Sequence, residues 1–143
     1  MQISQVNRIR LVGLLFVLIL GSVIYAADTG MCKRYFDFIR AFPLGDKVCH
    51  FTLMGIFSAL GNLAVRCRTL GNGPLAPGVG TVVVTVFVVV EEISQIWIPL
   101  RTFELFDLTA DFLGIACGAA IARTFSQRQK VGGVDASSAK PEA

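Results

Sequence analysis

The chain has few of the residues that build familiar catalytic and metal centres. Its 143 residues include one histidine and four cysteines. The cysteines show no CxxC pair and no metal-ligand spacing: Cys32, Cys49, Cys67 and Cys117. The sequence also has no nucleophile elbow and no HExxH segment. We therefore expect no metal, no cofactor and no disulfide, and we expect the thiols to pack as small apolar groups.

Charge is equally scarce, since 16% of the residues are charged and 54% are hydrophobic. The formal net charge of +3 is too small to indicate a nucleic-acid partner, and no RNA- or DNA-binding motif is present. The basic residues flank apolar blocks, as they do in membrane proteins. This composition excludes an ordinary soluble domain and makes the lipid bilayer the expected surrounding.

The long apolar runs predict an all-α, polytopic membrane domain over residues 1–125, built as a four-transmembrane-helix bundle. We expect spans at about 9–27, 46–66, 79–99 and 105–123, each near the ~20 residues that cross a bilayer. The third contains TVVVTVFVVV, which would favour a strand in a soluble protein, but the length of the run favours a helix. The polar residues 126–143 predict a disordered cytoplasmic tail.

Three features refine this prediction. Pro99 and the short connection over 101–104 predict that the third and fourth spans form an antiparallel hairpin. Asp46 is a good N-cap for the second span. Gly114-x-x-x-Gly118 is typical of two helices in close contact.

Two segments leave alternatives open. The first apolar run is either a retained helix or a signal peptide cleaved before Asp28, and its length and poor cleavage site favour the retained helix. Residues 28–45 mix aromatic and charged side chains. That pattern is typical of a short interfacial helix in the headgroup layer, or of an ordinary loop that packs its aromatic side chains on the helix ends.

Four spans place both termini on one side of the membrane, together with eight of the 13 Lys and Arg residues. The positive-inside rule then predicts cytoplasmic N- and C-termini. The polar residues of the last three spans would lie together at the opposite, outer end. They form the predicted ligand-binding set: Asp46, Lys47, His50, Glu91, Glu92, Gln95, Arg101, Asp107 and Asp111. Charges within a membrane are costly unless they are paired or wetted, so a shared polar site is expected.

Two stretches carry a resemblance to a known family. They are F-P-L-G-D-K-V-C-H-F at 42–51 and E-E-I-S-Q-I-W-I-P-L-R-T-F-E-L-F-D-L-T-A-D-F-L-G-I-A-C-G at 91–118. Together they resemble the VanZ-like family of small bacterial membrane proteins. The matching residues are Asp46, Lys47, His50, Glu92, Gln95, Arg101, Asp107, Asp111 and Gly114. Leu100 replaces the family's usual Gly, and Asp111 stands where Asn is common.

The resemblance implies a multi-pass protein of the bacterial inner (cell) membrane that acts in the cell envelope. The family's founding member is linked to resistance to the glycopeptide antibiotic teicoplanin. Resistance itself transfers poorly to other members of such a family.

Three functions fit the polar residues. The first is a non-enzymatic factor that binds a lipid head group or a cell-wall or glycan precursor. This function requires only that the polar residues bind a ligand, without any catalytic arrangement. The second is a membrane-embedded enzyme with His50, Glu92 and Asp111 as candidate acid-base residues. The third is a purely structural cluster with the pairs Lys47–Glu92 and Arg101–Asp107. The missing catalytic motifs weigh against an enzyme, and the sequence predicts no oligomeric state.

Overall fold

The computed structural model describes residues 3–73 and 76–138, and all its regular elements are helices. They are α1 (Ile3–Asp28), α2 (Lys33–Arg40), α3 (Gly45–Ala64), α4 (Val79–Ser94) with the short helix η1 (Gln95–Trp97), and α5 (Leu105–Ser138). The described residues form no strand beyond a single bridge between Thr69 and Gly78. The predicted all-α fold is confirmed.

Three helical stretches are long and apolar enough to cross a membrane: Ile3–Asp28, Val79–Trp97 and Leu105–Gln129. They correspond to the first, third and fourth predicted spans. Their large apolar side chains are widely exposed, for example Leu18 and Phe106, and a bilayer would surround such surfaces with hydrocarbon. The length and apolar composition of these three helices are consistent with a membrane protein.

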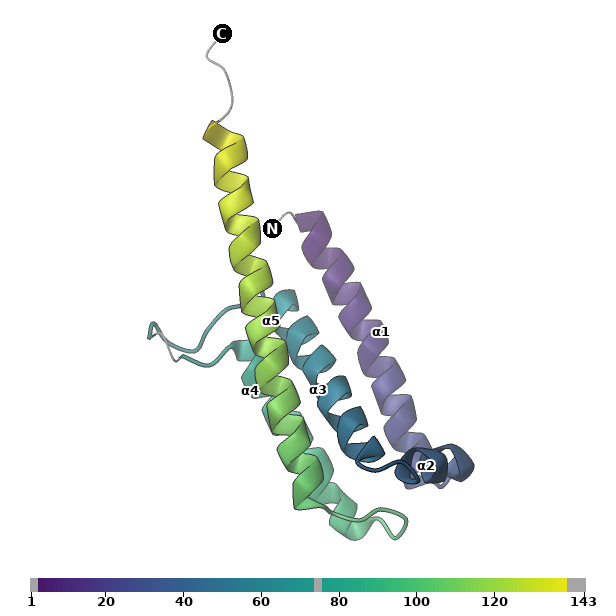
Figure 1. Cartoon of the computed structure of the whole chain (residues 1–143). Helices are drawn as coiled ribbons and strands as arrows, with labels where there is room; N and C mark the ends of the chain where they lie inside the picture. The colour runs from purple at the N-terminus through teal and green to yellow at the C-terminus, as the bar shows by residue number, and fades with distance from the viewer. Residues whose placement is uncertain (1–2, 74–75, 139–143) are drawn as a thin grey trace.

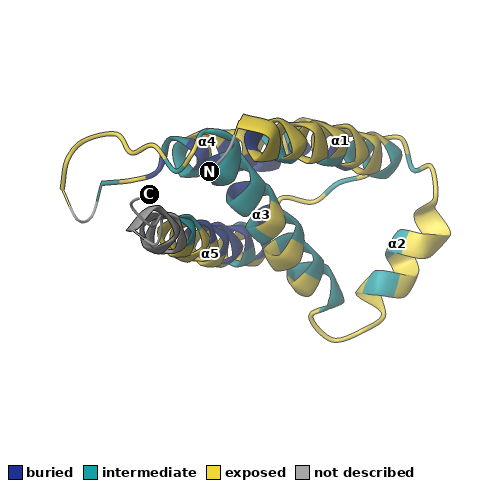
Figure 2. Cartoon of the chain, turned by 90° about the horizontal axis from the view of Figure 1, so that it is seen from above, coloured by how far each residue is buried: buried dark blue, intermediate teal, exposed yellow. Residues whose placement is uncertain are grey.

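The fourth expected span is α3, which does not meet the same criteria and stays a prediction. Its place in the bundle explains its polar character. It packs against each of the other α-helices, and most extensively against α5. Figure 2 shows it among α1, α4 and α5, with the exposed faces turned outward. A helix enclosed by its neighbours exposes less surface to lipid, so it can carry polar groups if they find partners.

The β-branched segment of α4 is helical, as its length predicted. Its inward stripe consists of Gly80, Val84, Val88 and Glu92, one residue every four positions. Val84 and Val88 join the apolar core with Leu20, Met54 and Ile115. The same helical period therefore carries Glu92 inward at the end of an otherwise apolar stripe.

The contact between α3 and α5 depends on glycine. A Cβ atom at Gly114 would meet the backbone of Phe51, and one at Gly118 would meet the backbone of Gly55. In the same contact, Ser58 Oγ donates a hydrogen bond to the carbonyl oxygen of Ile115 at 2.9 Å. The GxxxG pattern thus joins two helices of one chain at backbone distance.

Chain direction brings four helix ends together. The helices α1 and α4 end, and α3 and α5 begin, at the end of the bundle where α2 lies (Figure 1). Residues 98–104 join the antiparallel neighbours α4 and α5, as predicted. We call this region the polar end, because the predicted site residues belong to these helix ends.

Two local predictions are wrong. Helix α3 begins at Gly45 after Leu44, whose φ of 60° is left-handed, so Asp46 lies in the first turn and does not cap the helix. Helix α5 continues to Ser138, so residues 126–138 are helical where a disordered tail was predicted. Gln127, Arg128 and Gln129 are good helix formers and extend the membrane helix without a break. The rest of the predicted tail, 139–143, lies outside the described residues.

We expect Gly118→Ala to lower the thermal stability of the detergent-purified protein. The new methyl group would force α3 and α5 apart, at a cost of about 1–3 kcal/mol for overpacking. Gly21→Ala is the matched control, because nothing lies within 4 Å of a Cβ at Gly21. Unfolding followed by circular dichroism compares the two variants. Equal unfolding temperatures would contradict the backbone contact.

Candidate functional site

The polar end holds a cluster of charged and amide side chains, most of which are joined by hydrogen bonds and ion pairs. All nine residues of the predicted ligand-binding set belong to it, together with two that the sequence analysis did not include. The full set is Asp28, Asp46, Lys47, His50, Glu91, Glu92, Gln95, Arg101, Glu104, Asp107 and Asp111. It draws on α1, α3, α4, η1, α5 and the loop before α5.

Lys47 is the centre of the first part of the network. Its Nζ lies 2.7 Å from Asp46 Oδ2, 2.6 Å from Glu104 Oε2 and 2.8 Å from Asp107 Oδ1. The first two contacts are hydrogen bonds. The third is an ion pair without hydrogen-bond geometry. Three of the chain's own carboxylates therefore surround the Lys47 ammonium group, and two of them accept its hydrogen bonds.

Glu92 ties α4 to the start of α5. Its side chain is fully buried, with 0% of its surface exposed. Oε2 accepts a hydrogen bond from Gln95 Nε2 at 2.9 Å, and Oε1 accepts one from the backbone N–H of Glu104 at 3.1 Å. The spacing E-x-x-Q places donor and acceptor one helical turn apart. Both donors are neutral groups.

Arg101 connects the loop before α5 with two other helices. Its Nη2 donates to Glu91 Oε1 at 3.3 Å, and its Nη1 lies 3.7 Å from Asp28 Oδ1. Gln95 Nε2 also donates to Glu91, at 3.1 Å. The guanidinium therefore links the end of α1 to the end of α4.

These contacts correct the ion pairs expected from the sequence. Lys47 was expected to pair with Glu92, and Arg101 with Asp107. In the described part of the chain, Lys47 takes Asp107 and two further carboxylates, while Arg101 takes Glu91 and Asp28. The sequence located the charges at one end of the bundle, but the pairing depends on how the helices are rotated.

His50 and Asp111 form a separate pair. Nδ1 of His50 lies 3.0 Å from Oδ1 of Asp111, and Asp111 is 1% exposed. His50 follows Asp46, and Asp111 follows Asp107, by four residues each. One helical turn therefore separates this pair from the Lys47 group on both helices.

Two groups of three side chains have ligand atoms within 4.8 Å of one another. One consists of His50, Glu92 and Asp111, and the other of Asp46, Glu104 and Asp107. Lys47 contacts every member of the second group. The second group thus has a lysine among its contacts, whereas the first has no lysine or arginine contact in the described part of the chain.

The polar end has many more carboxylates than cations. Its seven Asp and Glu side chains face two permanent cations, Lys47 and Arg101, and one histidine. Both cations already contact carboxylates. Such a site attracts cations and hydrogen-bond donors, and it offers little to a phosphate group.

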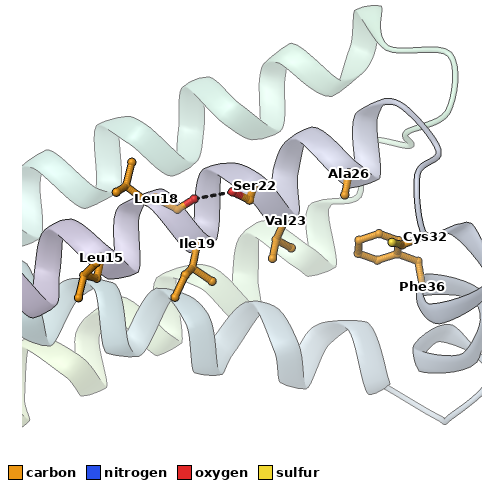
Figure 3. A pocket seen from close by; sticks show the side chains of 8 residues that line it. All are labelled: Leu15, Leu18, Ile19, Ser22, Val23, Ala26, Cys32 and Phe36. Atoms are coloured by element: carbon orange, nitrogen blue, oxygen red, sulfur yellow. Dashed lines mark hydrogen bonds between the residues drawn. The ribbon is translucent and has the colours of Figure 1, made fainter.

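A separate hollow lies along α1 and is lined mainly by its apolar side chains, closed at one end by Cys32 and Phe36 (Figure 3). Ser22 is the lining residue with a hydroxyl group, and its Oγ donates a hydrogen bond to the carbonyl oxygen of Leu18 at 2.8 Å. None of its lining residues belongs to the polar network. The chemistry of the described chain therefore lies at the polar end and not in this hollow.

The sequence analysis missed Glu104 and Asp28. Glu104 was assigned to the connection between spans, and Asp28 was treated only as the residue after an apolar run. Both residues could have been predicted, because the predicted topology places the end of the first span and the connection before the fourth span at the same membrane face. An acidic side chain at that face can contact Lys47 or Arg101, as Asp107 does.

Comparisons with protein-family models, with curated proteins and with solved structures found no match for this chain.

We expect Lys47→Met to destabilise the protein by about 1–3 kcal/mol, because three carboxylates would lose their shared partner. Lys33→Met is the control, since Lys33 is exposed at the start of α2. Thermal unfolding in detergent and abundance in the membrane measure the effect. If both variants unfold at the wild-type temperature, Lys47 does not hold this end of the bundle together.

Proposed function

We propose that the chain is a VanZ-like membrane protein of the bacterial cell envelope whose polar end binds the head group of a lipid or of a lipid-linked cell-wall precursor. The cluster of charged and amide side chains at one end of an apolar bundle supports this proposal most directly, because four of its members are buried: Glu92, Gln95, Asp107 and Asp111. Ionisable groups within membrane helices usually mark a site, because they are costly to keep for packing alone.

The excess of carboxylates over cations at the polar end limits the chemical class of ligand that can bind there. Sugar hydroxyls and an ammonium group donate hydrogen bonds to carboxylates, and these are in excess here. Lys47 and Arg101 could have met a phosphate, but each is occupied by carboxylates. The ligand is therefore a head group rich in hydroxyl or amino groups. A cell-wall precursor of that kind would also connect the protein with glycopeptide sensitivity.

The proposed orientation places the polar end in the outer leaflet, with α3 as a fourth span and both termini in the cytoplasm. The distribution of Lys and Arg supports it. Helix α2 would then lie in the outer headgroup layer. It carries the exposed aromatic residues Tyr35 and Phe38 beside Lys33 and Arg34, a mixture that suits this layer.

A membrane-embedded enzyme acting on a lipid or glycan is the second candidate, and the His50–Asp111 pair favours it. A carboxylate 3.0 Å from Nδ1 fixes the orientation of the imidazole. His50 would act as general base through its other ring nitrogen, with Asp111 as a positioning residue. Glu92 stays a candidate acid-base residue beside them.

Binding to the detergent-purified protein tests the main proposal, with native mass spectrometry as the measurement. The probes are phosphatidylethanolamine, phosphatidic acid and a lipid-linked amino-sugar precursor. We expect the amine- or sugar-bearing probes to bind best and Glu91→Gln to weaken them about tenfold, the effect of one charge-assisted hydrogen bond. Asp37→Asn, an equal charge change on the exposed face of α2, is the control.

Preference for phosphatidic acid, or an equal loss of affinity in both variants, would contradict a head-group site made of carboxylates. A new product formed by the wild type but not by His50→Gln would favour the enzyme. Teicoplanin sensitivity of cells that carry the same variants then decides whether the site has an envelope role.

Orientation can be tested at Cys32, which is exposed between α1 and α2. We expect a membrane-impermeant maleimide to label it from outside intact cells. Cys117 is also exposed but lies within a candidate span, so lipid should protect it. Cys32→Ser is the control and should abolish labelling. Labelling of Cys32 only after the cells are opened would reverse the topology.

A further inference from the structure

One group at the polar end has the donors of a metal site and, in the described part of the chain, no lysine or arginine in contact with it. We propose that His50, Glu92 and Asp111 bind a divalent transition-metal ion of the zinc class. The ligand atoms of these residues lie within 4.8 Å of one another, and each residue comes from a different helix. The inference goes beyond the proposed function and does not depend on it, because metal binding is measured without any lipid.

The donor set selects the class of ion. One imidazole nitrogen with two carboxylate oxygens suits Zn²⁺, Mn²⁺ and related ions, whereas Ca²⁺ and Mg²⁺ prefer oxygen ligands alone. Three protein ligands leave at least one coordination position for water or another small ligand. This is the ligand number of an open site, not of a closed structural one.

The ligand atoms would have to move closer together. Two ligands bonded to one ion at about 2.1 Å in tetrahedral geometry lie about 3.4 Å apart, and these atoms lie within 4.8 Å of one another. The nitrogen and oxygen of His50 and Asp111 are already 3.0 Å apart. Glu92 is held by Gln95 and by the Glu104 backbone, one hydrogen bond to each oxygen, which leaves a lone pair free on both. Such supporting bonds orient metal ligands.

Charge supplies the independent argument. Glu92 and Asp111 are 0% and 1% exposed. In the described part of the chain neither is paired with a lysine or arginine, and the hydrogen-bond donors to Glu92 are neutral. Burying two carboxylates without a cation is costly. In the neighbouring group of Asp46, Glu104 and Asp107, Lys47 balances the negative charge of the carboxylates. A divalent ion would balance the charge of Glu92 and Asp111 in the same way.

The test uses the full chain in detergent, stripped with a chelator and free of any histidine tag. Zn²⁺ titration by calorimetry should give about one ion per chain and a higher unfolding temperature. Co²⁺ should give visible ligand-field bands that Zn²⁺ removes. Because His50 is the only histidine in the sequence, an imidazole signature in the Co²⁺ complex reports on this residue alone.

His50→Gln and Asp111→Asn should each weaken Zn²⁺ binding by at least about 100-fold, more than the 10–100-fold typical of supporting residues. Asp37→Asn should leave the affinity unchanged, because it removes an equal charge on the exposed face of α2. No Zn²⁺ binding by the wild type, no Co²⁺ bands, or an equal loss in Asp37→Asn would each overturn the proposal. If a ligand variant does not fold, the wild-type Co²⁺ spectrum decides.

Discussion

The low tolerance of a hydrocarbon environment for unpaired charge governs the structure at the polar end. Seven carboxylates lie where three candidate membrane helices and α3 meet, and they cannot all stay ionised without partners. Lys47 and Arg101 neutralise part of this charge. Neutral donors from Gln95 and the Glu104 backbone support Glu92. The helices are therefore held together by ion pairs at one end, and by apolar packing with a few neutral hydrogen bonds, such as that of Ser58 with Ile115, along the rest of their length.

The sequence predicted most of the architecture, because the length of an apolar run is a strong constraint in a membrane. It also predicted that Glu92, Asp107 and Asp111 would meet, because alternating helix direction brings their positions to the same end. It could not predict the pairing. Whether Lys47 reaches Glu92 or Asp107 depends on helix rotation, and that is decided by the contact between the α3 and α5 backbones. The helical tail over 126–138 was missed because polar composition was read as disorder, although Arg128 and its neighbours are good helix formers.

The pairing changes the view of what the site can recognise. As residue types, lysine and arginine suit a phosphate, and carboxylates suit sugar hydroxyls or amines. Once both cations are engaged within the chain, only the acidic and hydrogen-bond-accepting half of that chemistry remains free. Under the proposed function, such a site would distinguish ligands by their hydrogen-bond donors and their positive charge. Head groups that share a phosphate but differ in their amine would then bind with different affinities.

The glycine contact between α3 and α5 also limits how this end can open. Two backbones that touch at Gly114 and Gly118 cannot slide or tilt independently without breaking the packing. They behave as one rigid body that carries Lys47, His50, Asp107 and Asp111. Helix α1 meets the polar end through the 3.7 Å ion pair of Asp28 with Arg101. A movement that opens this end would therefore take place between the rigid α3–α5 pair and its neighbours α1 and α4, not between α3 and α5.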